Sequence, residues 1–223
     1  MSSELREEAL ESRWEAAPVV ALVIALQVLL AMISLEQGWD LWSLPWWIWL
    51  IPAVPELCLL IALAWDRPRK RLEGRGLRRE ASLALIGLVS LANGLAVVAL
   101  IGSIASAHET SGRQLLLKGI VVWTTNVIAF GLWFWELDGG GPVRRQEADP
   151  PTPDWDFPSK EKVAHWRSHL IDYLYVSFTN SIAFSPTDAM PLTRRAKVLM
   201  LIEASTSSLT VLLVAARAVN ILK

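Results

Sequence analysis

Five long apolar runs dominate this sequence and limit what it can fold into. They cover residues 16–35, 44–65, 81–107, 115–135 and 196–222, and each matches the roughly 20 residues that a helix needs to cross a bilayer. Hydrophobic residues make up 53% of the 223 residues, a larger share than in an ordinary soluble domain. We therefore predict an all-α, polytopic integral membrane helix bundle, with five long transmembrane helices and one short pore-helix-like segment.

The polar stretches divide the chain into four parts. Residues 1–15 form an amphipathic N-terminal tail whose acidic start differs from a signal peptide, so we expect the first apolar run to be retained. Residues 16–135 are the four-helix membrane region, and residues 169–223 hold the short segment and the last run. Between them, residues 136–168 contain three successive glycines and five prolines. These residues interrupt a regular helix, so we expect an extended connector that builds no core.

Tryptophan and basic residues indicate how the helices are placed in the membrane. Indole rings favour the headgroup boundary, and a cluster of them precedes the second run: Trp39, Trp42, Trp46, Trp47 and Trp49. The loop at residues 66–80 carries seven Lys or Arg against three acids, which predicts a cytoplasmic position. Counting from this loop places the N-terminus and the connector inside and residues 108–113 outside.

A polar stretch, SFTNSIAFSPTD at residues 177–188, lies between the connector and the last run. Residues 170–178 are apolar enough to enter the membrane as a short helix, and Pro186 prevents a helix from continuing. We expect a polar loop at bilayer depth, where backbone groups need protein or water as partners. Alternatively, the hydroxyls bond to their own helix and the segment is a weak crossing helix. The predicted loop consists of Thr179, Asn180, Ser181, Ala183, Phe184, Ser185, Pro186, Thr187 and Asp188.

The stretch SFTNSIAFSPTDAMPLTRRAKVLM resembles the pore region of potassium-channel-type proteins. In this resemblance residues 177–179 match the end of the pore helix, residues 183–187 match the filter, and Asp188 matches the acid after it. Pro191 and Arg195 fall near the family's proline and basic position. Ser185 and Thr187 stand where the family has filter glycines, so the resemblance does not imply potassium selectivity.

Nearly the whole chain also resembles a group of uncharacterised bacterial inner-membrane proteins that carry a domain of unknown function. The matching residues are Asp156, Phe157 and Pro158 in the connector and DYLYVSF at residues 172–178. This resemblance implies a multi-pass protein of the bacterial inner membrane and no established activity. The two resemblances differ on topology, because pore loops of channels enter from outside, whereas the basic loop places the connector inside. We favour six membrane segments with the fifth short and irregular; re-entry from the cytoplasm, or failure of the basic-loop rule, are the alternatives.

Ionisable and polar residues within the apolar runs are further candidates, because they are costly in lipid unless paired or hydrated. Glu56 lies in the second run. On the last run, a stripe at spacings of 3, 4, 7 and 14 cannot face lipid, and it lines either a hydrated path or a helix interface. This stripe consists of Glu203, Thr206, Ser207, Thr210 and Arg217. In the third run, the small residues Gly87, Ser90 and Gly94 are expected to let a neighbouring helix approach closely.

Motifs for catalysis and for cofactors are weak. His165, His169 and Asp172 recur at helical spacing, but this pattern is common by chance, so we expect no metal site. The lone Cys58 gives no disulfide framework, and a net charge of -1 without a large basic patch argues against nucleic acid. We predict no enzyme and no cofactor.

The function that this pattern favours is a channel-like path for small ions through a homo-oligomer in the lipid bilayer, without potassium selectivity. Two alternatives remain open. A non-conducting membrane scaffold would use the same polar residues only to join helices. A secondary carrier would have a midplane site near Glu56.

Overall fold

The computed structural model describes residues 3–39, 44–106, 111–146, 149–164, 166–183 and 189–221. Trp42, residues 108–110 of the loop at residues 108–113, His165 and Leu222 lie outside these ranges. Part of the predicted pore-like loop also lies outside the described residues, namely Phe184, Ser185, Pro186, Thr187 and Asp188.

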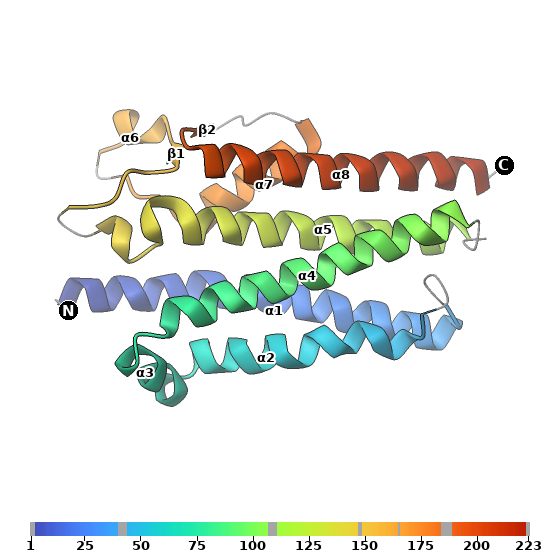
Figure 1. Ribbon diagram of the computed structural model, residues 1–223, viewed down its shortest axis with the longest axis horizontal. Coiled ribbons are helices and arrows are strands. Elements are labelled where there is room, and N and C mark those ends of the chain that lie inside the picture. Colours follow the sequence, from blue (N-terminus) through green and yellow to red (C-terminus); the bar gives the residue numbers. More distant parts are fainter. Residues whose placement is uncertain are drawn as a thin grey trace. The chain divides into compact units, whose positions relative to one another are not determined.

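The described chain is almost entirely helical, which confirms the predicted all-α class (Figure 1). Its helices are α1 (Ser3–Gln37), η1 (Trp46–Trp49), α2 (Leu50–Ala64), α3 (Asp66–Gly74), α4 (Arg78–Ala105), α5 (Gly112–Leu137), η2 (Asp138–Gly140), η3 (Arg144–Gln146), α6 (Ser159–Lys162), α7 (Leu170–Ala183) and α8 (Arg194–Ile221). Two short strands, β1 (Trp155–Asp156) and β2 (Met190–Pro191), pair in antiparallel fashion with Trp155 opposite Pro191.

Five of these helical stretches are long and apolar enough to cross a membrane. They are Glu15–Gln37, Trp46–Ala64, Arg78–Ala105, Gly112–Gly140 and Arg194–Val219, and each overlaps one predicted run. Large apolar side chains such as Leu91 and Leu201 are more than 60% exposed on them, as expected for faces that contact lipid rather than water. The chain is therefore a multi-pass membrane protein.

The chain divides into two compact units. Residues 1–19 and 127–205 form one, which we call the connector unit because it contains the whole connector. Residues 20–126 and 206–223 form the other, the apolar unit. The long helices α1, α5 and α8 each contribute residues to both units.

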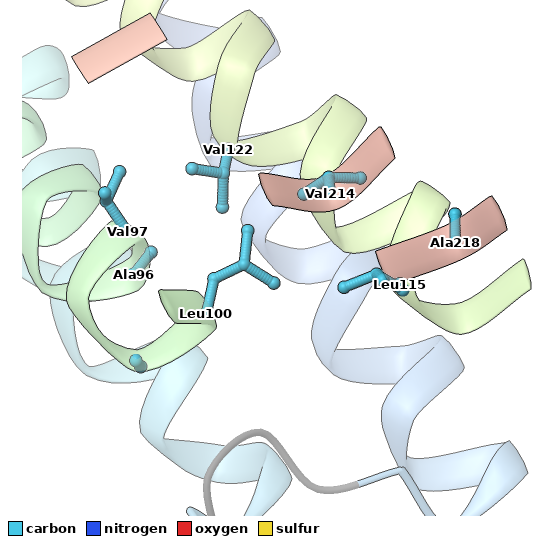
Figure 2. Close-up of a cluster of buried hydrophobic side chains, with 8 residues drawn as sticks. Ala96, Val97, Leu100, Leu115, Val122, Val214 and Ala218 are labelled. Atoms are coloured by element: carbon cyan, nitrogen blue, oxygen red, sulfur yellow. The ribbon is translucent and has the colours of Figure 1, made fainter. Parts of the chain in front are cut away.

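In the apolar unit, apolar side chains of α4, α5 and α8 form one buried cluster. Its buried cluster consists of Ala96, Val97, Ala99, Leu100, Leu115, Val122, Val214 and Ala218. Figure 2 shows the Leu100 side chain extending from α4 toward Val122 of α5 and Val214 of α8. Gly119 permits this packing, because a Cβ there would lie 2.9 Å from both methyl carbons of Val214.

The close approaches in the structure occur at glycines other than those expected. A Cβ built at Gly87 or Gly94 meets nothing within 4 Å among the described residues, so the prediction of close helix contacts there is wrong. In the connector unit, a Cβ at Gly131 of α5 would lie 3.1 Å from the Cα of Leu174 and 2.6 Å from its Cδ2. Gly131 therefore sets how closely α7 packs on α5.

The connector is folded, which corrects the prediction that it builds no core. Trp155 and Phe157 are fully buried, and so is the carboxylate of Asp154. The chain enters the connector through a turn in which Gly139, Gly140 and Gly141 all have positive φ, at 53°, 81° and 105°. Prolines and glycines do exclude a long helix here, but they leave the polar and aromatic side chains able to pack on the ends of α5, α7 and α8.

Candidate functional site

A buried carboxylate links α7 to α8 within the connector unit. Glu203 has no exposed surface. Its Oε2 accepts a hydrogen bond from Nδ2 of Asn180 at 2.7 Å, and its Oε1 accepts one from the hydroxyl of Ser177. Asn180 Nδ2 also donates to the carbonyl of Met200 at 2.9 Å, so one amide serves two acceptors a turn apart on α8. We call Ser177, Asn180 and Glu203 the Glu203 cluster.

The pore-like residues described by the structure are helical. Thr179, Asn180, Ser181 and Ala183 all belong to α7, so the loop does not begin after Phe178 as predicted. The Thr179 hydroxyl lies 3.0 Å from the carbonyls of residues 175 and 176, and the Ser181 hydroxyl donates to Phe178 at 2.9 Å. Back-bonding of this kind lets hydroxyl residues continue a buried helix without water, which is the alternative left open by the sequence.

α7 buries polar side chains together with Leu170, Tyr173 and Val176, and its exposed face is apolar. Ser177, Asn180 and Ser181 are buried, whereas a stripe on the other face is exposed and apolar. That stripe consists of Ile171, Tyr175, Phe178 and Ile182. This inverted pattern is typical of a helix in lipid rather than in water. At 14 residues, α7 is roughly 21 Å long, too short for a hydrocarbon core of roughly 30 Å.

A second polar network lies in the apolar unit. Asn93 of α4 donates to Asn126 of α5 at 3.2 Å, and Asn126 donates to the hydroxyl of Ser207 on α8 at 3.0 Å. All three side chains are buried. The amide donors of Asn93 and Asn126 therefore each meet an acceptor on a neighbouring helix.

The remaining members of the predicted stripe have different environments. Thr210 is buried and bonds the carbonyl of Thr206 at 2.8 Å, whereas the Thr206 side chain is only partly buried. Arg217 lies near the end of α8 and is also partly buried. Glu203 bonds within the connector unit and Ser207 within the apolar unit, so these two neighbours on one helix use separate partners.

Glu56 belongs to the apolar unit and has no exposed surface. Its Oε1 accepts a hydrogen bond from Nε2 of Gln27 at 3.2 Å, which joins α1 to α2. A carboxyl group with an amide partner is the kind of pair that buried polar groups in membrane helices form.

The strongest set of polar contacts involves Asp138, which sequence reasoning missed. Its Oδ1 accepts the backbone N–H groups of Asp154 at 2.6 Å and Trp155 at 3.3 Å, and its Oδ2 accepts the phenol of Tyr173. Arg145 completes the set, with Nη1 3.9 Å from the same Oδ2 and its guanidinium 5.1 Å from the centre of the Tyr173 ring. One buried carboxylate thus fixes the connector to α5 and α7.

Asp154 forms the second half of this arrangement, which we call the aspartate clamp (Asp138 and Asp154 with their partners). Its carboxylate is fully buried, accepts Nε of Arg195 at 2.6 Å, and accepts the same guanidinium again through Nη2. Thr193 also donates to it, while the Thr193 oxygen lies 3.3 Å from the N–H of Ala196 at the start of α8. A two-point Arg–carboxylate pair is both strong and directional, so it fixes the connector to α8.

Aromatic side chains fill the space beside the clamp. Trp155 lies between Phe134 and Tyr173, with ring centres 4.9 and 6.3 Å away, and Phe157 lies 5.2 Å from Tyr173. These contacts bring together Phe157 and Tyr173, which the sequence places in two separate motifs. One local signal could have indicated this packing. A stretch rich in glycine and proline has Asp138 before it and Asp154 after it, and Trp155 and Phe157 follow Asp154.

Of the residues at helical spacing, His165 lies outside the described residues, and His169 contacts a glutamate of α1. His169 Nδ1 lies 2.8 Å from Oε1 of Glu15, and Glu15 Oε2 accepts the N–H of Leu170. Asp172 accepts the N–H of His169, as a residue at the start of a helix commonly does. No group of three or more His, Cys, Asp or Glu side chains suited to a metal occurs among the described residues.

Comparison with known proteins adds no family to this picture. No protein-family model, no curated protein and no solved structure matches the chain. What identifies it is its own architecture: a multi-pass helical membrane protein whose connector is fixed to three helices by the aspartate clamp.

Proposed function

We propose that this chain is a non-conducting membrane scaffold that holds its connector as a rigid platform at the membrane boundary. The observation that carries the proposal is the aspartate clamp, in which two buried carboxylates bind the connector to α5, α7 and α8. A connector that only linked two helices would not need Asp138 and Asp154 to be removed from solvent. Fixing its backbone at several points makes this segment a defined surface.

The polar residues within the helices support the same proposal. Asn180 and Ser177 both bond Glu203, and Asn126 bonds helices on either side of it. Interhelical hydrogen bonds of this type hold membrane helices together, because lipid offers no competing partner. In this scaffold the hydrogen bonds hold the helices together and form no path for ions.

A channel-like polar path for small ions is the second candidate function. It is favoured by the complete burial of two carboxyl groups, Glu56 and Glu203, within candidate membrane spans. Intramembrane carboxyl groups commonly mark ion or proton pathways. In this candidate a homo-oligomer would supply the path, and Glu203 of α8 would lie along it.

Flux through the purified chain in liposomes separates the two candidates. We expect no leak of protons, sodium, potassium or chloride under an imposed voltage, and no change in Glu203→Gln. The glutamine keeps an oxygen that can accept from Asn180, and it has an N–H that can donate to the Ser177 oxygen. A leak that Glu203→Leu or Asp188→Leu abolishes would refute the scaffold and favour the channel. Glu161→Leu, which changes an exposed acid of α6, is the matched control.

A further inference from the structure

The connector unit contains a cavity of about 250 Å³ that the scaffold function does not use. It lies between the end of α5, the proline-rich part of the connector and α6. Asp138, Arg145, Phe157, Lys160, Trp166 and Arg167 contribute to its wall. Because one water occupies about 30 Å³ in the liquid, the cavity has room for a group of several heavy atoms.

The wall of this cavity is positively charged. It carries three cationic side chains, Arg145, Lys160 and Arg167, against one carboxylate, Asp138. The oxygens of Asp138 already accept two backbone N–H groups and the phenol of Tyr173. The acid therefore serves the protein, and the cationic side chains of the wall outnumber its carboxylates by two.

The Ser168 hydroxyl in the wall is engaged within the protein. The Tyr173 phenol has one proton and donates it to Asp138, so the Ser168 hydroxyl, 3.0 Å from the Tyr173 oxygen, donates to that oxygen. Among the charged side chains of the wall, Lys160 and Arg167 are the two exposed ones.

The cavity lies where a membrane span ends. Asp138 and Gly139 in its wall are among the last residues of the span Gly112–Gly140, so the connector leaves the bilayer there. Trp166 also lies in the wall, with its ring 5.3 Å from that of Phe157. Indole rings favour the headgroup region, which is rich in phosphate.

We propose that this cavity binds a phosphate-bearing anion through Lys160 and Arg167, with Arg145 behind them. Guanidinium and ammonium groups bind phosphate oxygens by charge-assisted hydrogen bonds, and lipid-binding basic pockets use the same chemistry. The anion is either the headgroup of an anionic phospholipid or a soluble phosphate ester.

Native mass spectrometry of the full chain, purified in a delipidating detergent, tests this proposal. The probes are phosphatidylglycerol, zwitterionic phosphatidylcholine and inorganic phosphate. We expect phosphatidylglycerol to bind at least about tenfold more tightly than phosphatidylcholine, and the double variant Lys160→Gln/Arg167→Gln to lose about tenfold in affinity, as for loss of charge-assisted bonds. The matched control, Lys162→Gln/Arg194→Gln, removes the same charge from exposed sites outside the cavity wall and should bind like the parent.

Each outcome bears on the proposal. Equal binding by the parent and the Lys160→Gln/Arg167→Gln variant, or an equal loss in the control, would overturn it. If the two lipids bind equally and millimolar inorganic phosphate displaces phosphatidylglycerol, the ligand is a soluble phosphate ester rather than a lipid headgroup. Thermal unfolding of both variants shows whether they keep the parent's fold.

Discussion

The connector unit and the apolar unit are held together by different interactions. In the connector unit, buried carboxylates at Asp138, Asp154 and Glu203 collect donors from several segments, and aromatic rings fill the space between them. In the apolar unit, aliphatic side chains such as Leu100 and Val214 form a buried cluster, and the polar contacts include a neutral amide and hydroxyl network and the pair of Gln27 with Glu56.

The difference follows from the surroundings of each unit. Helices in lipid gain little from burying apolar groups against one another, so close packing and a few hydrogen bonds must associate them. A connector that leaves a membrane span meets water, so the burial of Trp155 and Phe157 is favourable there. Backbone groups buried beside these rings need hydrogen-bond partners within the protein. Charged clamps therefore occur where the chain leaves the membrane spans.

The largest expected effect comes from breaking the aspartate clamp. Asp138→Ala removes the acceptor of two backbone N–H groups and of the Tyr173 phenol, and it leaves the partly buried Arg145 without its carboxylate. We expect a loss of at least about 3 kcal/mol in the free energy of unfolding. Unfolding in mixed micelles with increasing SDS measures this loss, and limited proteolysis should cut within the connector.

Asp149→Ala is the matched control for this variant, because Asp149 is an exposed acid of the same connector. It should unfold like the parent. If Asp138→Ala also unfolds like the parent and resists protease, the connector does not depend on the clamp, and the contrast between the two units fails.

An intermediate effect is expected from filling a close approach. In Gly131→Ala the new Cβ would lie 3.1 Å from the Cα of Leu174, so α7 must move away from α5. Such overpacking typically costs about 1–3 kcal/mol. The same unfolding experiment should show this loss, together with weaker burial of Ser177 measured by cysteine labelling of Ser177→Cys in a Cys58→Ala background.

Two further glycines sharpen the comparison between the units. In Gly119→Ala, in the apolar unit, the new Cβ approaches the Val214 side chain rather than a backbone atom, and it should cost less than Gly131→Ala. Gly94→Ala meets nothing within 4 Å among the described residues, so the higher helix propensity of alanine should make it neutral or slightly stabilising. A loss in Gly94→Ala as large as in Gly131→Ala would contradict this account.

The smallest effect is expected in the neutral network of the apolar unit. Asn126→Leu removes the acceptor of Asn93 and the donor to Ser207. Measured interhelical hydrogen bonds in membranes average about 0.6 kcal/mol and reach about 1.7 kcal/mol, so we expect a loss of about 1 kcal/mol. A double-mutant cycle with Ser207→Ala isolates the Asn126–Ser207 term, and a coupling above about 3 kcal/mol would contradict the prediction.

The membrane spans could be predicted from the sequence because the signal is local. A run of apolar residues about 20 long needs no knowledge of the rest of the chain, and all five runs correspond to helices in the structure. The residue at which α7 ends was harder to predict from the sequence. Thr179 and Ser181 favour a loop by composition, but their hydroxyls bond their own helix once other segments bury them.

The aspartate clamp could not be predicted because its partners are distant in the sequence. Asp138 meets the backbone of Trp155 and the phenol of Tyr173, and Asp154 meets Arg195. Glycine and proline in the connector argue correctly against a long helix, but they carry no information on which side chains will be buried. Glu203 was recognisable as a residue that lipid would exclude, while its bonds to Ser177 and Asn180 depend on how α7 packs.

The three glycines at the exit of α5 impose an unusual restriction on this chain. Any other residue at positions 139 to 141 would have to adopt a left-handed backbone, and a Cβ at Gly139 would also lie 2.7 Å from Cγ of Arg145. The reversal of direction at this point returns the chain toward the helix that it has just left, so that residue 154 comes back to residue 138. The conformation of these three glycines thereby directs the thirteen residues from 142 to 154 back to residue 138.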